Sequence, residues 1–311
     1  MGSQFTVAQR LVLWIALFLG MTCVELREAA AQPFKLPFTD PARMFEQAFG
    51  EDSEADRKAL EKIVVTVEEE QQLGKQILQE GLAMYKESGI TIVTTGRDVE
   101  YLQSLVDTLK PRMRHQDRYP AIKVMVARSP KIDARSCPGG TLIFFEGLLD
   151  AAGSEAALVG IVGHELSHLD RGHQLLPVRR MKLMERSLSS PRNLSQFAQS
   201  GPSLMKLWAR PFRPEDERDA DSDGVAWALA SGYDAREMAR LFPKKGGKAT
   251  TETLPWATYF QSHPDNGQRV QAIHAQYLKW KKLHPSAEPL FIGTENLAER
   301  LSRSQAEAAN K

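Results

Sequence analysis

Apolar residues recur at a spacing of three to four positions in several stretches of this chain, which predicts amphipathic helices. The stretches with this spacing are residues 65–88, 99–113, 154–172, 214–232 and 266–280. Alternating apolar positions at 122–126, and a short apolar run at 141–147 that follows two glycines, predict two β-strands. Helices dominate the pattern, so we expect an α+β fold that is mainly helical, with a small β-sheet beside the helix at 154–172.

The first apolar run differs from the others because no polar face interrupts it between Leu11 and Val24. Such a length is short for a membrane-spanning helix and typical of the core of a signal peptide. Ala29, Ala30 and Ala31 supply a small-residue cleavage site, so residues 1–31 are predicted to be a signal peptide. Charged residues just before that site make an uncleaved N-terminal anchor at residues 11–24 the alternative. Both interpretations predict an exported protein, periplasmic or extracellular, and the anchored form adds an association with the membrane.

Composition divides the rest of the chain into three parts. Residues 32–64 contain several prolines and are predicted to form an irregular arm, whereas residues 65–285 hold the helices and strands of one domain. Residues 286–311 are predicted to be a polar, helix-prone tail. Within the domain, residues 189–214 are rich in Ser, Pro and Asn, and both a lid over an active site and a plain surface connection fit this stretch.

The charge balance excludes one class of partner. The 311 residues include 40 Lys and Arg against 39 Asp and Glu, a formal net charge of +1. Nucleic-acid binding usually needs a basic field, so we expect no nucleic-acid partner. Cys23 lies in the N-terminal apolar run, and its removal would leave Cys137 without a partner for an internal disulfide.

The strongest chemical signal is the sequence HELSH, which places His164, Glu165 and His168 in the predicted helix at 154–172. Residues four apart lie on one face of a helix, so both imidazoles can reach one metal ion. Glu165 is then placed to act as a general base toward a water at that ion. The alternative is a solvated helix face with two ordinary histidines. The apolar residues at 156–162 favour the metal, because a buried histidine pair needs polar partners.

A catalytic zinc site needs a third protein ligand, with the fourth position left for water. His173 follows His168 by five residues, one fewer than in the zinc proteases whose third ligand is a histidine of the same motif. We therefore expect His173 to cap its helix. Glu217 and Asp221 are four apart in the predicted helix at 214–232; Glu217 suits the third ligand, and Asp221 suits a hydrogen bond that orients a ligand histidine. The alternative, a solvated acidic face, remains because neighbouring positions are acidic too.

Four motifs in this order resemble the gluzincin metallopeptidases that include the CAAX prenyl endopeptidase, the HtpX heat-shock protease and the Oma-type and BepA-type quality-control proteases. They are Pro138-Gly139-Gly140 followed by a strand and Gly147-Leu148-Leu149; the acidic helix start before HELSH; Glu217 with Ala220, Asp221 and Gly224; and Ser262-His263-Pro264 with Arg269. The resemblance covers roughly residues 67–275. With one apolar span, at its start, the chain resembles the soluble, exported branch.

The resemblance implies a zincin-like zinc metalloendopeptidase that cleaves polypeptides. It assigns one Zn²⁺ per chain to His164, His168 and Glu217, and the catalytic base to Glu165. It also implies catalytic roles for His263 and Arg269, as donors to the oxyanion of the intermediate. Two alternatives stay open: His263 as a fourth metal ligand that holds the enzyme latent, and Arg269 as a partner of Asp221.

The substrate is expected to lie extended along a strand formed by Asp133, Ala134, Arg135, Ser136 and Cys137. The family usually has Asn-Ala where this chain has Asp133-Ala134, which bears on substrate preference. Cys137 could be a latch on the zinc or a structural thiol. The expected function is quality control of exported or envelope proteins. The alternatives are a chaperone-like or latent zinc protein on the same fold, plugged by His263, and a helical binding module without metal.

Overall fold

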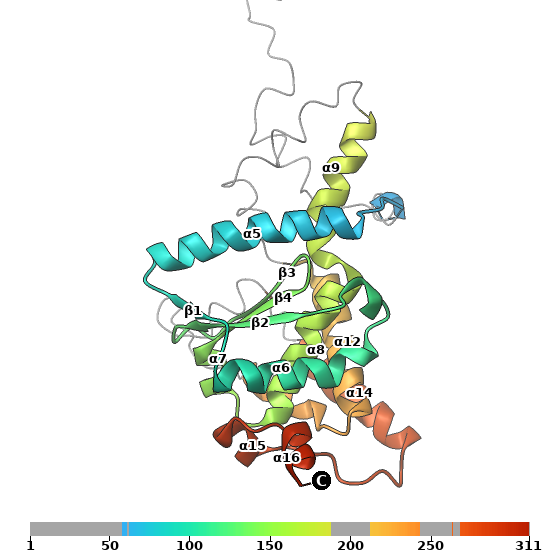
Figure 1. The fold of residues 1–311 in the computed structure, drawn as a ribbon. Helices are drawn as coiled ribbons and strands as arrows, with labels where there is room; N and C mark the ends of the chain where they lie inside the picture. Colours follow the sequence, from blue (N-terminus) through green and yellow to red (C-terminus); the bar gives the residue numbers. More distant parts are fainter. Residues whose placement is uncertain (1–57, 61, 188–211, 243–262, 264–267, 311) are drawn as a thin grey trace, which may run out of the picture. The chain divides into compact units, whose positions relative to one another are not determined.

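The computed structural model describes residues 58–60, 62–187, 212–242, 263 and 268–310 (Figure 1). These residues belong to one compact unit of the chain. The predicted signal peptide or anchor, most of the predicted arm and most of the predicted loop at 189–214 lie outside the described residues. In the described part, no helix is both long and apolar enough to cross a lipid bilayer.

Helices predominate among the described elements (Figure 1). The longer helices are α5 (Val67–Glu87), α6 (Arg97–Leu109), α8 (Glu155–Arg171), α9 (Leu176–Ser187), α12 (Pro214–Ala230) and α14 (Arg269–Leu283). The shorter ones are α7 (Glu146–Ala151), α15 (Thr294–Glu299), α16 (Arg303–Ala309) and the 3-10 segments η1 (Lys110–Arg112), η2 (Gln116–Arg118), η3 (His173–Leu175) and η4 (Ala235–Leu241). The strands are β1 (Thr91–Val93), β2 (Lys123–Arg128), β3 (Ala134–Cys137) and β4 (Thr141–Phe145). The expectation of a mainly helical α+β fold with a small sheet is confirmed.

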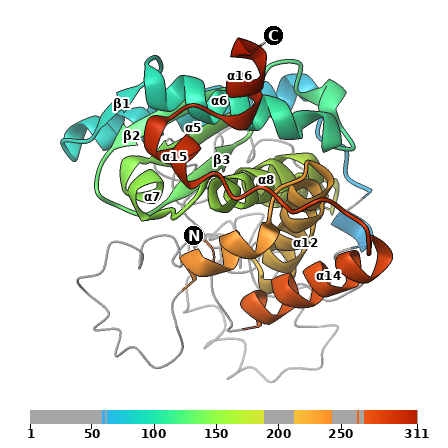
Figure 2. The same cartoon turned by 90° about the horizontal axis from the view of Figure 1, so that it is seen from below.

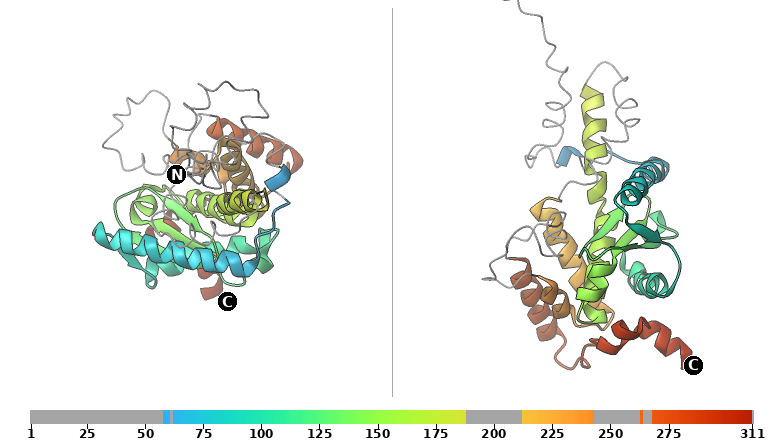
Figure 3. Two further views of the ribbon diagram at one scale, coloured as in Figure 1. Left: turned by 90° about the horizontal axis from the view of Figure 1, so that it is seen from above. Right: turned by 90° about the vertical axis from the view of Figure 1, so that its left-hand side faces the viewer.

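The strands form one mixed sheet in the order β1-β2-β4-β3. β2 and β4 are parallel, whereas β1 pairs with β2 and β3 pairs with β4 in antiparallel fashion. Alternate residues of β4 enter two separate parts of the core: Leu142 and Phe144 pack with α6 and α8, and Ile143 and Phe145 pack beneath α5. Both faces of the sheet are therefore covered by helices, α5 on one side and α6 and α8 on the other (Figures 1 and 3).

Helix α5 is anchored on the Pro138-Gly139-Gly140 turn that connects β3 and β4. A Cβ at Gly74 would lie 1.9 Å from the carbonyl oxygen of Pro138, so helix and turn are in backbone contact. Glu70, buried on α5, accepts a hydrogen bond from the amide of Gly139 at 3.1 Å. Gly139 has φ +80° and Gly140 +86°, values that L side chains rarely adopt. The two glycines thus allow the backbone of this turn to lie directly against α5.

Helix α8 is the centre of the fold, and every residue from Glu155 to Asp170 is buried. Its first turn is capped by the Ser154 hydroxyl, which accepts from the Ala157 amide at 3.3 Å. Helix α12 packs against it almost without intervening side chains: a Cβ at Gly163 would lie 2.9 Å from Cα of Gly224. Figure 2 shows α8, α12 and α14 side by side. The contact of the two glycines brings the acidic turn of α12 close to HELSH.

The segment predicted as a polar tail contains α15 and α16 and contacts the start of α8 (Figure 1). The amides of Glu155 and Ala156 donate to the carbonyls of Gly293 and Ile292, both at 3.0 Å. The buried Glu155 carboxylate accepts from the amide of Arg303 at 3.0 Å. The C-terminal segment thus satisfies polar groups at the end of α8 that is farther from the histidines.

Candidate metal centre

Four buried side chains converge where α8 meets α12: His164 and His168 from α8, Glu217 from the first turn of α12, and His263. Their ligand atoms all lie within 4.8 Å of one another. Two of the three predicted ligands are one helical turn apart, and the third reaches them because α8 and α12 touch at Gly163 and Gly224. The structure thus brings the predicted metal ligands together, with His263, the candidate fourth ligand, among them.

The distances between these atoms are close to those expected for ligands of one tetrahedrally coordinated ion. Nε2 of His164 lies 3.0 Å from Nε2 of His168 and 3.0 Å from Nδ1 of His263. Oε1 of Glu217 lies 3.0 Å from Nδ1 of His263 and 3.4 Å from Nε2 of His168. Ligands at the usual Zn–N distance of about 2.0–2.1 Å are roughly 3.3 Å apart along each edge of a tetrahedron. The donor set and its spacing therefore match zinc.

Glu165 adds a carboxylate beside this cluster. Both of its oxygens are buried, and neither accepts a hydrogen bond from the described part of the chain. Oε1 lies 3.3 Å from Nε2 of His263. A buried carboxylate that accepts no hydrogen bond is costly, so the placement of Glu165 suits a group that faces a metal site. The residues present fit a catalytic metal better than a packed core.

Asp221 orients the first ligand histidine. Its Oδ1 lies 2.9 Å from Nδ1 of His164, a contact that favours the tautomer in which Nδ1 donates to Asp221 and Nε2 can bind a metal. Arg269 holds the Asp221 carboxylate through two hydrogen bonds of 2.6 and 2.7 Å. Burial alone would raise the pKa of Asp221, but the bonds from Arg269 and His164 outweigh it and hold the pKa below its ordinary value. Asp221 is therefore a carboxylate, as this role requires.

Arg269 is fully buried behind the ligands. Besides Asp221, it contacts Glu217, with Nη1 at 2.8 Å from Oε2, and donates to the carbonyl oxygen of His263 at 3.1 Å. The structure thus shows the pairing with Asp221 that was the alternative for Arg269, while its donation to an oxyanion stays a prediction. This one side chain connects the start of α14 to Glu217 and Asp221 of α12.

His263 stands at the fourth corner of the cluster, between Glu217 and Glu165. Burial lowers the pKa of its imidazole, but these two carboxylates outweigh burial and raise the pKa to about 9. Nδ1 faces Glu217 and Nε2 faces Glu165. The geometry is compatible with both predicted roles, a donor at the site and a fourth ligand.

The predicted substrate strand is β3, which lies at the edge of the sheet beside α8. Its one strand partner among the described residues is β4. Just before it, the buried Asp133 accepts from the amide of Ala134 and from Nε of Arg135, both at 3.0 Å. Burial raises the pKa of the Asp133 carboxyl, an effect that Arg135 opposes. The strand thus begins at an ion pair whose buried carboxylate, Asp133, interacts electrostatically with His263 and Glu165.

Cys137 and Ser136 complete β3. Cys137 is fully buried beneath α5 with Ala127, Ile143 and Phe145, and burial raises the pKa of its thiol to about 12. It is outside the cluster of ligand atoms. The structure therefore favours the structural thiol over the zinc latch.

His173 behaves differently from its prediction. The helix cap is Gly172, in the left-handed conformation with φ +66°, so the expectation that His173 caps α8 is wrong. Burial lowers the pKa of His173 to about 3, so the ring is neutral and does not supply the expected cation. Its Nδ1 lies 2.9 Å from Nδ1 of His168.

Phe212, which no sequence signal marked, stacks on His168 with ring centroids 3.8 Å apart.

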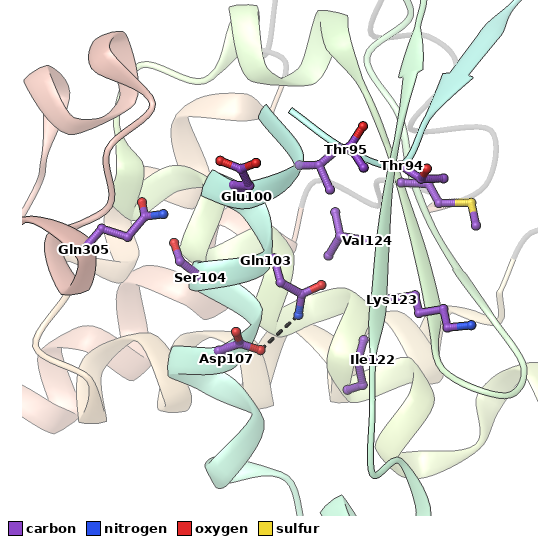
Figure 4. Close-up of a pocket in the computed structure, with 12 residues that line it drawn as sticks. Thr94, Thr95, Glu100, Gln103, Ser104, Asp107, Ile122, Lys123, Val124 and Gln305 are labelled. Atoms are coloured by element: carbon purple, nitrogen blue, oxygen red, sulfur yellow. Dashed lines mark hydrogen bonds between the residues drawn. The ribbon is translucent and has the colours of Figure 1, made fainter. Parts of the chain in front are cut away.

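A separate open pocket lies between α6, β2 and the connection from β1 to α6 (Figure 4). Its lining includes Glu100, Gln103, Asp107 and Lys123, and Gln103 donates to Asp107 at 2.9 Å. None of the predicted site residues lines it.

Comparison with known proteins agrees with this geometry. The model of the peptidase family M48 matches residues 97–277, which include HELSH, Glu217 and His263. The chain is also similar to the mitochondrial metalloendopeptidase OMA1 of Arabidopsis thaliana, with 25% identity over 158 residues. That alignment covers 49% of this chain and 30% of the relative, so the match spans less than a third of the relative's length. The chain belongs to peptidase family M48, the zinc metallopeptidase family that its motifs resembled.

Proposed function

We propose that the chain is a zinc-dependent endopeptidase, with one Zn²⁺ held by His164, His168 and Glu217. The observation that carries the proposal is the close spacing of four buried ligand atoms next to a carboxylate, Glu165, that accepts no hydrogen bond from the described residues. In an ordinary core both features would be destabilising. In a metallopeptidase the clustered ligand atoms bind the metal, and the carboxylate serves as the general base.

Zinc at this position would act as a Lewis acid and lower the pKa of a water molecule to about 7. The side chains around it have separate tasks. Asp221 fixes the Nδ1–H tautomer of His164 and so keeps its Nε2 available. Glu165 accepts the proton of the attacking water and delivers it to the leaving amine. His263, whose Nε2 lies 3.3 Å from Glu165, donates to the carbonyl oxygen of the scissile bond.

The substrate is a polypeptide that binds in an extended conformation along the outer edge of β3. An edge strand offers amide and carbonyl groups to a peptide, which then adds a strand to the sheet. The contact between β3 and α8 supports this placement, because a peptide on this edge passes the HELSH helix. The pair formed by Asp133 and Arg135 lies where the strand begins, so it is suited to influence which side chains are accepted.

The physiological role proposed is quality control of exported or envelope proteins. The support is the apolar run at residues 11–24, which predicts export, and membership of family M48. A periplasmic or extracellular location, with or without membrane attachment through this segment, follows from the same prediction.

One observation favours a second candidate function. Nδ1 of His263 lies 3.0 Å from both Nε2 of His164 and Oε1 of Glu217, where the catalytic water would otherwise bind. A latent or chaperone-like zinc protein would have His263 as a permanent fourth ligand. Such a protein would bind zinc but would not cleave peptides until His263 left the metal.

Zinc content and casein cleavage of the wild type and Glu165→Gln test the proposal. Glu80→Gln, an exposed substitution on α5, is the matched control. The endopeptidase should bind one zinc ion, and Glu165→Gln should retain it while cleavage falls roughly 10²–10⁴-fold. Full activity in Glu165→Gln would overturn the mechanism. Zinc binding without turnover in the wild type, together with cleavage by His263→Ala, would establish the latent protein instead.

A further inference from the structure

Metal binding by His168 fixes which of its two ring nitrogens carries the proton. Its Nε2 faces the ligand cluster, 3.0 Å from Nε2 of His164 and 3.4 Å from Oε1 of Glu217. A histidine binds a metal through a nitrogen that carries no proton, and a neutral imidazole has one proton to place. As a ligand, His168 must therefore carry its proton on Nδ1, and this buried N–H needs an acceptor.

The atom in position to accept is Nδ1 of His173, at 2.9 Å. It can accept only if His173 carries its own proton on Nε2, which points toward Oδ1 of Asp216 at 3.8 Å. The proton arrangement that metal binding requires of His168 is thus one that the position of His173 can accept.

The backbone explains how a residue five positions after His168 reaches it. Gly172 ends α8 in the left-handed conformation, with φ +66°, and η3 then turns the chain back. This reversal directs His173 at the Nδ1 side of the His168 ring and away from the metal side. It explains why His173 is close to a ligand without being one.

The neighbours of His168 also fix the plane of its ring. Phe212 stacks on one face, with centroids 3.8 Å apart and planes 18° from parallel. His164 and His173 approach edge to face, at 4.7 and 4.9 Å between centroids. Because these neighbours fix the ring plane, His168 can give up its hydrogen bond to His173 only by rotating, and that rotation would turn Nε2 away from the metal.

We propose that His173 is a positioning residue for the metal: it accepts a hydrogen bond from Nδ1 of His168 and so holds Nε2 of that ring toward the zinc ion. His164 has a carboxylate, Asp221, in the equivalent position. The two ligand histidines are therefore oriented by different groups, one anionic and one neutral. This inference rests on the proposed zinc site.

The test is zinc affinity, measured by competition with a chromophoric chelator after the metal has been removed. His173→Leu removes the acceptor, whereas His173→Asn retains an acceptor oxygen near the position of Nδ1. His274→Leu, an exposed substitution on α14, is the control. His173→Leu should weaken zinc binding roughly 10–100-fold, and His173→Asn should recover most of the loss. Wild-type affinity in His173→Leu would overturn the inference.

Two further measurements separate this inference from protein stability and from the proposed function. Nitrogen-15 NMR of the zinc-loaded wild type should show His168 protonated at Nδ1 and His173 at Nε2, a result that needs no folded variant. Protonation of His173 at Nδ1 would overturn the inference. His164→Ala should lose zinc; a wild type that binds no zinc would overturn the proposed function and this inference together, whereas tight binding by both wild type and His173→Leu overturns the inference alone.

Discussion

The contact between α8 and α12 offers a test that leaves every ligand in place. In Gly224→Ala, the new Cβ would lie 2.9 Å from the carbonyl oxygen of Gly160 and 3.0 Å from the amide nitrogen of His164. Because ordinary contacts begin near 3.5 Å, the helices must separate locally by about 0.5 Å. Neither neighbour can yield by a side-chain rotation, since both are backbone atoms of α8.

The expected cost has two parts. Overpacking of this kind costs roughly 1–3 kcal/mol, more than the approximately 1 kcal/mol that alanine gains over glycine within a helix. The same displacement moves Glu217 relative to His164 and His168, whose ligand atoms are spaced by 3.0–3.4 Å. A displacement of about 1 Å at a catalytic site can cost 10²-fold, so we expect kcat/KM to fall roughly tenfold at saturating zinc.

Chemical denaturation and peptide-cleavage kinetics measure these two effects. Gly153→Ala is the matched control, because a Cβ at that position meets nothing within 4 Å. It should leave both stability and kcat/KM near the wild-type values. If Gly224→Ala were as stable and as active as the wild type, the backbone contact between α8 and α12 would not be what positions Glu217.

Two other residues test the buried charges. Arg269→Met leaves Asp221 without its guanidinium partner. Loss of one member of a buried ion pair should lower the free energy of unfolding by roughly 3–5 kcal/mol, as measured by denaturant titration. An unchanged denaturation midpoint would contradict this. Burial would raise the pKa of Asp223, but Arg114 and the other donors around it hold that pKa well below its ordinary value. Asp223 therefore stabilises the fold above its unfolded pKa of about 3.9, and this contribution is lost as pH falls below that value. Asp223→Asn should flatten the decline in stability below pH 4, and a decline identical to that of the wild type would contradict this.

The central helix and its chemistry could be predicted because their signals are local. HELSH places both histidines on one face of α8 by spacing alone, and apolar neighbours indicate that this face is buried. Local spacing could not identify Glu217 as a ligand, because its helix follows α8 by more than 40 residues. Its position in an acidic helical turn and the order of the family motifs provided the evidence. What the sequence could not show is the close contact of Gly163 and Gly224, which joins the two helices.

His173 and Phe212 show where such prediction fails. The spacing excluded His173 as a ligand, but its role depends on the left-handed turn at Gly172, which points the ring at the far side of His168. A glycine before a histidine at the end of a metal-binding helix was the available signal. Phe212 follows a stretch without clear periodicity, so its stacking on His168 had no signal in the sequence.

The C-terminal segment could not be placed from its composition. Its residues are largely polar and exposed, yet the backbone at Ile292 and Gly293 pairs with the first amides of α8. The first amides of a helix have no partner within the helix, so they donate to whichever carbonyl the fold brings near. Hydrophobic pattern carries no information about such backbone pairings.

The most direct test of the account is a crystal structure of the zinc-loaded protein with anomalous scattering measured at the zinc edge. We predict one zinc peak per chain, bonded at about 2.0–2.2 Å to Nε2 of His164, Nε2 of His168 and a carboxylate oxygen of Glu217. A zinc ion bound elsewhere, or none between α8 and α12 at full zinc loading, would contradict the metal centre described here.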